Sequence, residues 1–211
     1  AYFCTLLTRH EVQGILQVVP FENSGMGREL VYFDVKLANN LVVTFATSHL
    51  ESPVGPTIDG KKEIYTKQRR RQLELSLETL SNRRHVMFGG DMNWVDPTAK
   101  EENDGWMKLS PSWKDCWIEA HGQNYLQTNP GYTYDGVNNP MLGHRYRSRL
   151  DRILFKSEGS RLQLKTIDII GTQPIPRLTY TKTYASGFQK QVPVLPSDHF
   201  GLFAVFKVAM I

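Results

Sequence analysis

The sequence is poor in cysteine and has no long hydrophobic run. Its 211 residues include only two cysteines, Cys4 and Cys116, which are far apart and lack the Cys-x-x-Cys spacing of zinc ribbons. This pattern argues against a disulfide framework and a zinc site, and it favours a reducing compartment. No apolar stretch approaches the roughly 20 residues of a membrane helix, and the start AYFCTLLTRH does not resemble a secretion signal. We therefore expect a nuclear or cytoplasmic protein without a membrane partner.

Charge of neither sign dominates the composition. Lysine and arginine number 25 against 21 acidic residues, which gives a formal net charge of +4 at pH 7. Such a balance permits a polyanionic partner without requiring one. With 40% hydrophobic residues and no internal repeat or low-complexity tract, the chain is suited to one globular domain with a sizeable core.

Strands dominate the predicted elements. Runs rich in β-branched, aliphatic and aromatic residues predict strands over 2–8, 14–19, 30–37, 41–47, 85–88, 148–156 and 200–208. A turn at Asn39-Asn40 separates the third and fourth of these strands. From Lys67 to Leu80 the period becomes helical, with Leu73 and Leu77 on the same face. Many strands with few helices predict two packed sheets with helices outside, an α/β sandwich.

Polar residues follow the buried strand 85–88. Gly89 and Gly90 allow close approach of the backbone, and Asp91 and Asn93 stand just beyond the strand. Taken alone, this pair is as consistent with an Asx turn as with a hydrolytic site.

Three further clusters have the same character. His49 ends the strand 41–47, Asp151 interrupts an otherwise apolar strand, and His199 opens the last strand. Each has an ordinary structural alternative: a surface histidine, a solvent-facing carboxylate or a serine-capped turn. Their joint occurrence at the edges of different strands is how loop residues on a rigid scaffold form an active site.

The motifs together resemble one known superfamily. GDMN at 90–93 and SDHFGL at 197–202 are similar to the GDxN and SDH motifs of the endonuclease/exonuclease/phosphatase superfamily, which includes deoxyribonuclease-I-like nucleases, inositol polyphosphate 5-phosphatases and sphingomyelinases. TSHLES at 47–52, GYTYD at 131–135 and RLDRILF at 149–155 resemble its 5′-tyrosyl-DNA phosphodiesterases of type two, which remove topoisomerase II remnants from DNA 5′ ends.

The resemblance implies a fold and a domain organisation. It implies a four-layer α/β/β/α sandwich of two mixed sheets, formed by one catalytic domain over residues 1–211, and a full-length protein that is a monomer. The superfamily's early asparagine and the metal-ligating glutamate that follows it do not occur; only Glu11 lies near. We expect the chain to be the C-terminal three quarters of the domain, without its N-terminal strands. The alternative is a natural loss of the ligand, which would leave a non-catalytic binding module.

The resemblance also implies roles for the catalytic residues. Asp91 would orient and deprotonate the attacking water, and Asn93 would donate a hydrogen bond to a phosphate oxygen. His199 would stabilise the oxyanion, and Asp151 would hold the other nitrogen of its imidazole. His49 and Ser52 would contact phosphate from the opposite side.

The metal and the DNA contacts are implied in the same way. Magnesium is the expected ion, with manganese as a possibility, and Asp198 would be an outer carboxylate near it. Without the ligand glutamate, we expect weak metal binding and little turnover by this chain alone. Arg28, stacked on Trp117, and Tyr2 would border the DNA groove, although Trp117 is equally suited to the core and Tyr2 is better suited to packing.

Three alternatives stay open at this point. The cations Lys67, Arg69, Arg70 and Arg71 would contact phosphate or form a solvated helix face. The stretch 177–191 would be a hairpin over the substrate or a surface insert. The substrate of the same fold would be DNA ends bearing a tyrosyl adduct, or RNA, an inositol phosphate or a phospholipid; the HLES motif favours DNA ends.

Overall fold

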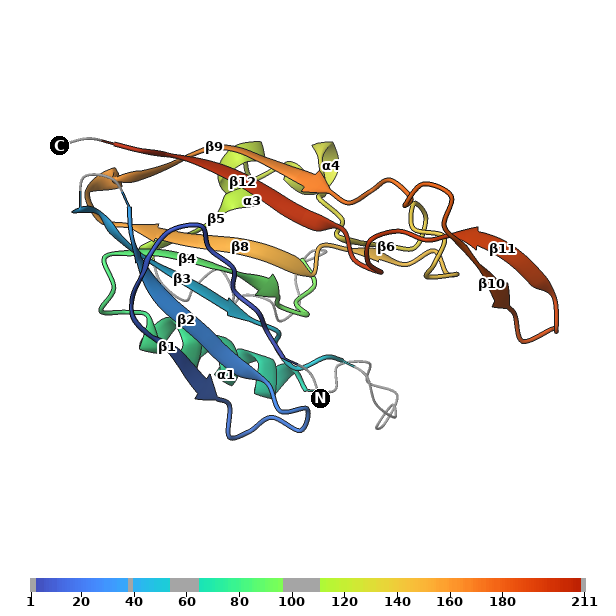
Figure 1. The fold of residues 1–211 in the computed structure, drawn as a ribbon, viewed down its shortest axis with the longest axis horizontal. Coiled ribbons are helices and arrows are strands. Elements are labelled where there is room, and N and C mark those ends of the chain that lie inside the picture. Colours follow the sequence, from blue (N-terminus) through green and yellow to red (C-terminus); the bar gives the residue numbers. More distant parts are fainter. Residues whose placement is uncertain (1–2, 38–39, 54–64, 97–110, 210–211) are drawn as a thin grey trace.

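A six-stranded mixed sheet lies at the centre of the molecule (Figure 1), in a computed structural model that describes residues 3–37, 40–53, 65–96 and 111–209. The strand order is β1 (Val12–Pro20), β2 (Glu29–Lys36), β3 (Val42–Ser48), β4 (His85–Asp91), β8 (Asp151–Ser157) and β5 (Trp113–Asp115). β3 and β4 are parallel, and the other neighbours are antiparallel. The strands predicted in these regions are therefore confirmed, with shifts of a few residues at their ends.

The hairpin between β2 and β3 closes where the sequence predicts a turn. The N–H of Leu37 donates to the carbonyl of Leu41 over 2.8 Å. Asn40 has a φ of 57°, in the left-handed region that asparagine tolerates better than most residues. This turn sets the register in which Phe33 faces Phe45.

Helix α1 (Thr66–Thr79) covers one face of the central sheet and connects the parallel strands β3 and β4 (Figure 1). Leu73 and Leu77, predicted on one helix face, are buried together with Leu80 and Phe88 in one core cluster. Among the cations at the start of this helix, Arg69 neither lies on a solvated face nor is placed to contact phosphate. It is buried and donates to the carbonyl of Glu51 over 3.3 Å. Its long side chain ties the helix to the strand end instead.

A second sheet packs on the other face. β9 (Leu162–Ile170) and β12 (Gly201–Val208) form an antiparallel pair. Its inner residues Ala204 and Phe206 pack with Phe155 of β8, and the short helices α3 (Cys116–His121) and α4 (Tyr125–Thr128) extend the same cluster. Helix, sheet and sheet thus form successive layers, with α3 and α4 beside β9, as expected for an α/β sandwich (Figure 1).

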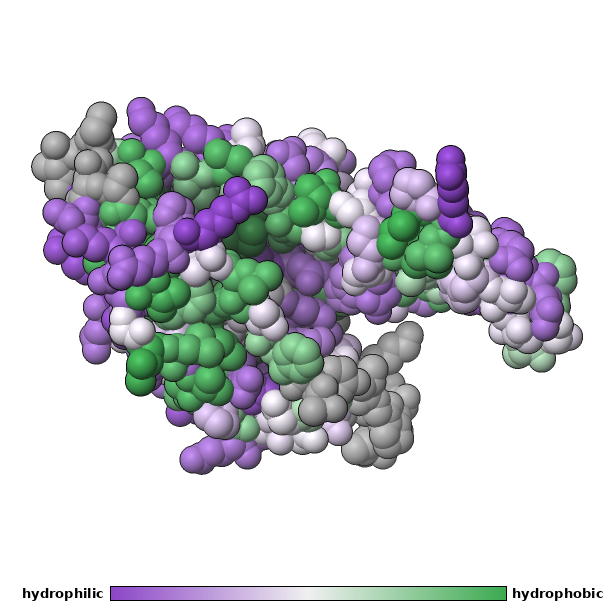
Figure 2. Space-filling view, viewed as in Figure 1, coloured by the Kyte–Doolittle hydropathy of each residue, from purple (hydrophilic) through white to green (hydrophobic). Residues whose placement is uncertain are grey.

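Apolar side chains also lie on the surface. Figure 2 shows them over β12 and over the strands of the central sheet, and they include Phe203 and Val205 of β12 and Ile15 and Leu16 of β1. No helix in the described part of the chain is long and apolar enough to span a membrane.

Three regions differ from the predicted elements or extend them. Residues 3–8 form no strand, because no described strand pairs with them and Phe3 and Leu7 are exposed. No strand was predicted over 162–170, where β9 lies. The register of β9 with β12 shifts at a bulge between Val205 and Phe206, which interrupts the regular alternation of its apolar positions. Most of the stretch 177–191 lies in a hairpin, β10 (Thr179–Thr183) and β11 (Gln189–Pro193), which projects to one side of the molecule (Figure 1).

Two smaller elements complete the described chain. β6 (Tyr134–Asp135) pairs with β7 (Arg147–Ser148) in a two-residue ladder. The short 3-10 helix η2 (Glu158–Ser160) connects β8 to β9.

Candidate active site

The predicted catalytic residues meet where β4 ends and β8 begins. Asp91 and Asp151 face each other in the β4–β8 register. His199, just before β12, places its Nδ1 2.7 Å from Asp151 Oδ2 and its Nε2 4.0 Å from Asp91 Oδ2. His49, just after β3, places its Nε2 3.3 Å from the same Asp91 oxygen. Two carboxylates and two imidazoles from four segments thus converge on one point.

Gly90 makes this convergence possible. It has a φ of 149°, and a Cβ built on it would lie 2.0 Å from the carbonyl oxygen of Ser48. No side chain fits between the ends of β3 and β4, so glycine lets the two strands close on each other. The neighbouring residues Leu50 and Asp91 then join by a backbone hydrogen bond of 3.0 Å.

The predicted Asx turn is present and belongs to the site. Asp91 Oδ1 accepts a 2.8 Å hydrogen bond from the backbone N–H of Asn93, whose φ of 48° is left-handed. The Asn93 amide donates to the carbonyl of Leu50 over 3.0 Å. The turn therefore holds one oxygen of Asp91 and leaves Oδ2 directed at the two histidines.

Backbone contacts that the sequence motifs do not reveal hold the Asp151–His199 pair. The hydroxyl of Thr133 accepts from the N–H groups of Leu150 and Asp151, at 3.1 and 3.0 Å, and its carbonyl accepts from the N–H of Phe200 at 2.7 Å. One fully buried residue of the GYTYD motif thus links the two segments that carry the pair.

Buried charges support the same segment from behind. Arg149 and Arg152 flank Asp151 in sequence, and both are about 1% exposed or less. Arg149 binds Asp96 and Asp115 over 2.8 Å each, and Arg152 binds Asp96 over 2.8 Å. Asp151 is the first residue of β8. Because side chains alternate along a strand, the next residue, Arg152, points to the opposite face, where it joins Arg149 in this ion-pair network.

The surroundings of Asp91 favour its neutral form. Burial, followed by the negative charge of Asp151, raises the pKa of Asp91 to about 6, against the opposing effects of His199 and the Asn93 N–H. A carboxylate whose pKa lies near neutrality can accept a proton from water and release it again.

The pKa values of the two histidines are shifted in opposite directions. Burial alone would lower the pKa of His199, but the hydrogen bond to Asp151 and the charges of Asp151, Asp91 and Asp198 outweigh burial and raise it. Burial and the positive charges of Arg28 and His199 lower the pKa of His49 to about 4. At neutral pH His49 is therefore neutral, while His199 is the histidine that readily carries a positive charge.

Asp91, Asp151 and His199 form the group in the described residues that could hold a metal ion, with ligand atoms within 4.8 Å of one another. The group offers two carboxylates, and the raised pKa of His199 disfavours the neutral imidazole that metals bind. Carboxylate oxygens with few other protein ligands fit a hydrated magnesium ion better than zinc. No glutamate belongs to this group among the described residues.

The other predicted site residues differ in their burial and in their distance from this group. Arg28 is buried, yet its charge acts on both His49 and Asp91. Ser52 is half-buried, one residue beyond the fully buried Glu51. Asp198 is exposed and acts on His199 through its charge. Tyr2 lies outside the described residues.

Trp117, which the sequence suits equally to a groove and to the core, lies in the core. Its indole is 3% exposed, donates to the carbonyl of Asn129 over 2.8 Å and lies against the ring of His121. A Cβ on Gly131 would lie 2.4 Å from the indole, so glycine there makes room for it. The large apolar ring is therefore core, and Arg28 does not stack on it.

Aromatic side chains that were not predicted do border the site. The Tyr134 ring lies 4.9 Å from the His199 ring, and its hydroxyl lies 3.0 Å from His144 Nε2. Tyr146, 51% exposed, is 6.1 Å from Tyr134. The only sequence signal was the aromatic spacing in GYTYD and HRYR, which did not distinguish surface from core.

The fold agrees with known structures. The chain superposes on the endonuclease/exonuclease/phosphatase protein of Beutenbergia cavernae with a TM-score of 0.60 at 15% identity, covering 95% of this chain and 46% of the other. It therefore has the fold of the endonuclease/exonuclease/phosphatase superfamily, as its motifs predict. No protein-family model matches the sequence.

Within that class the resemblance is to tyrosyl-DNA phosphodiesterase 2. The Mus musculus protein is 26% identical over 199 residues, which cover 92% of this chain and 45% of the relative, and the Rattus norvegicus protein is 26% identical over 196 residues. This chain thus spans less than half the length of these relatives.

Solved structures of tyrosyl-DNA phosphodiesterase 2 (TDP2) from other organisms share the fold of this chain. Truncated Caenorhabditis elegans TDP2 has a TM-score of 0.66 at 23% identity, and D. rerio TDP2 complexed with a single-strand DNA product has 0.65 at 19%. The alignments cover 95% of this chain and 67% and 69% of those chains.

Proposed function

We propose that this chain carries the hydrolytic centre of a phosphodiesterase that cleaves 5′-phosphotyrosyl bonds at DNA ends. The observation that carries the proposal is the convergence of Asp91, Asp151 and His199, with ligand atoms within 4.8 Å. The sequence similarity to tyrosyl-DNA phosphodiesterase 2 supports the reaction and the substrate class.

Asp91 takes the proton of the attacking water. Its Oδ1 is fixed by the Asn93 N–H, and its Oδ2 faces the site. With a pKa of about 6, most Asp91 side chains are ionised at neutral pH and can accept this proton. The water oxygen then bonds to phosphorus as the bond between phosphorus and the tyrosyl oxygen breaks.

His199 stabilises the charge that develops on the phosphoryl oxygens. Asp151 accepts the Nδ1 proton, so the Nε2–H is directed away from Asp151 and toward the position where a phosphate would lie. The neutral His49 and the second amide hydrogen of Asn93 supply further donors without repelling the imidazolium. Oriented donors of this kind favour the transition state over the substrate.

A divalent metal completes the chemistry in this proposal. Asp91 and Asp151 would hold a hydrated magnesium or manganese ion through its waters, which leaves their own proton contacts intact, with Asp198 further out. The ion would supply Lewis-acid stabilisation of the phosphate and of the leaving tyrosyl oxygen. Because the described group contains no glutamate, we expect weak metal affinity and slow turnover by this chain alone.

DNA is the substrate class that the surroundings support. The half-buried ring of Tyr134 beside His199 and the exposed ring of Tyr146 next to it offer faces on which a nucleobase can stack. The net charge of +4 suits a polyanion. The D. rerio TDP2 structure with a single-strand DNA product concerns a related protein and is consistent with this assignment. We expect the full-length protein to act as a monomer in the nucleus or cytoplasm.

A single-turnover assay tests the function. The chain, in excess over a 5′-phosphotyrosyl oligonucleotide, is expected to release tyrosine slowly and in proportion to magnesium, leaving a 5′-phosphate. The Asp91→Asn variant is expected to lose this activity, whereas Asp168→Asn, an exposed carboxylate on β9, is expected to retain it. Hydrolysis of an inositol polyphosphate in preference to the oligonucleotide would contradict the proposed substrate.

A further inference from the structure

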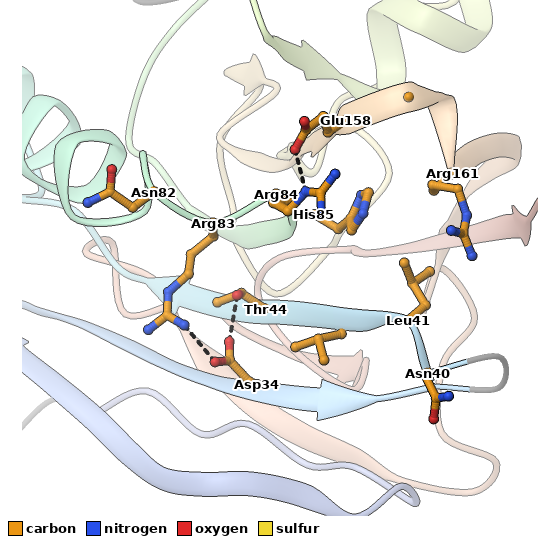
Figure 3. Close-up of a pocket in the computed structure, with 12 residues that line it drawn as sticks. Asp34, Asn40, Leu41, Thr44, Asn82, Arg83, Arg84, His85, Glu158 and Arg161 are labelled. Atoms are coloured by element: carbon orange, nitrogen blue, oxygen red, sulfur yellow. Dashed lines mark hydrogen bonds and ion pairs between the residues drawn. The ribbon is translucent and has the colours of Figure 1, made fainter.

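A second polar hollow lies at the other end of the central sheet. It encloses about 700 Å³ between the start of β4, the β2–β3 hairpin and the β8–β9 connection (Figure 3). His85 is the first residue of β4 and Asp91 the last. At about 3.3 Å per residue these ends are roughly 20 Å apart, so the hollow is separate from the candidate active site.

Three arginines line the hollow from two connections. Arg83 and Arg84 precede β4, and Arg161 precedes β9 on the opposite side (Figure 3). Arg83 Nη1 binds Asp34 over 2.7 Å and Arg84 Nε binds Glu158 over 2.6 Å. Arg161 donates its Nε to the carbonyl of Ala209 and has no carboxylate partner among the described residues. Two of the positive charges are therefore balanced, and one is not.

The carboxylates of the hollow do not oppose an anion strongly. Asp34 accepts from Thr44 with one oxygen, at 2.6 Å, and from Arg83 with the other. Each of the three guanidiniums has five N–H donors, of which these contacts occupy a minority. The remaining donors, with the uncompensated charge of Arg161, are suited to phosphate oxygens.

His85 is the most specific feature. Its side chain is buried, with 8% exposed, and its Nδ1 has no hydrogen-bond partner among the described residues. Buried polar atoms are nearly always paired, so this unpaired nitrogen means that no hydrogen bond at Nδ1 fixes the ring, and the ring of this lining residue is free to turn toward a ligand in the hollow. Burial, followed by the charges of Arg84 and Arg161, lowers the pKa of His85, which keeps its ring neutral and able to donate or accept.

The size of the hollow indicates more than a bare anion. Its volume is in the range of sites for nucleotide-sized ligands. Leu41 and Val42 add apolar surface beside the arginines, and Asn40 and Asn82 add amide groups at the edge. An anionic group would face the guanidiniums and His85, and a less polar group would lie over the leucine and valine.

We propose that this hollow binds a small phosphate ester of mononucleotide size, with the phosphate held by Arg161, Arg84 and His85. It binds the ester without hydrolysing it, since the described lining contains no carboxylate and histidine arranged like Asp151 and His199. The inference does not depend on the reaction proposed for the other end of the sheet.

Histidine NMR of the unmodified chain tests the proposal directly. Titration with adenosine 5′-monophosphate is expected to shift the ring signals of His85 saturably, with an affinity about tenfold above that of inorganic phosphate. Shifts confined to His49 and His199 would place the ligand at the candidate active site and overturn the proposal. Equal affinity for the two probes would overturn the assignment to an ester.

Two variants with a matched control locate the phosphate. Arg161→Gln is expected to weaken binding of the monophosphate about tenfold, and His85→Phe, which keeps a ring but removes the nitrogen, several-fold. Arg71→Gln removes an exposed arginine that pairs with Glu74 and Glu78 on α1, away from the hollow, and is expected to bind as the unmodified chain does. Equal binding by the Arg161 and Arg71 variants would contradict the proposal. The NMR titration stands even if a variant fails to fold.

Discussion

Asp91 and Asp151 face each other across β4 and β8, and His199 hydrogen-bonds to Asp151 while its other nitrogen lies 4.0 Å from Asp91. The two carboxylates thus share one imidazole but have different surroundings. Asp151 is compensated by the histidine proton, whereas Asp91 is buried beside a like charge. This asymmetry separates the base from the residue that orients the histidine.

The pH dependence of hydrolysis follows from these groups. The rate is expected to rise with pH through about 6, as Asp91 loses its proton and can act as a base. It is expected to fall again above the raised pKa of His199, as the imidazolium loses its proton. A bell-shaped profile of single-turnover rate against pH checks both limbs. A rate that keeps rising on the alkaline side would contradict the role of His199.

Replacing Asp151 with asparagine tests the histidine pair. The amide can still accept from Nδ1, but it removes the charge that raises the pKa of His199. The rate is expected to fall about 10²-fold, and the alkaline limb to move to lower pH. NMR titration of His199 measures the shift without relying on turnover. An unchanged His199 titration would show that Asp151 does not set its protonation.

The Gly90→Ala variant tests the close approach of β3 and β4. A methyl group at this position meets the carbonyl oxygen of Ser48 at 2.0 Å, so we expect the free energy of unfolding to fall by at least about 3 kcal/mol. Gly14→Ala is the matched control, because Gly14 also has a positive φ, 78°, but no atom lies within 4 Å of its added Cβ. A loss of only about 1 kcal/mol is expected there. Urea unfolding compares the two, and equal losses would refute the clash.

The ion-pair network behind Asp151 makes a separate prediction about stability. Arg149→Met leaves the buried carboxylates of Asp96 and Asp115 short of their main partner, so we expect a loss of about 3 to 5 kcal/mol. Lys114→Met breaks an exposed pair with Glu119 and is expected to change stability little. Chemical denaturation measures both. Similar small effects would mean that the network contributes little to the fold.

The sequence predicted the site better than its surroundings. His49 and Asp91 were found because they follow apolar strands. Asp151 was found because it interrupts an apolar strand, and His199 because it opens one. Their roles as catalysts stay a prediction. Thr133 escaped notice because its contribution is a pair of hydrogen bonds to backbone N–H groups, which leaves no pattern in sequence.

Where the sequence left alternatives open or predicted wrongly, the reason is the same: a local pattern does not show which partners the fold supplies. Trp117 has an apolar body and a polar N–H, so it is equally suited to a groove and to the core, and only the hydrogen bond to Asn129 decides for the core. Residues 3–8 have strand composition, but a strand forms only where a neighbour offers hydrogen bonds. Arg69, an apparent surface charge, is buried because the carbonyl of Glu51 outside the helix and the hydroxyl of Thr66 in its first turn supply acceptors.

The β4–β8 register has a consequence for how this sequence can vary. Because side chains alternate along a strand, deleting a single residue between Phe88 and Asp91 would turn the carboxylate to the opposite surface of the sheet and away from His199. Length changes in the β10–β11 hairpin leave that alternation untouched. Insertions and deletions among homologues should therefore accumulate in the β10–β11 hairpin and be rare within β4 and β8.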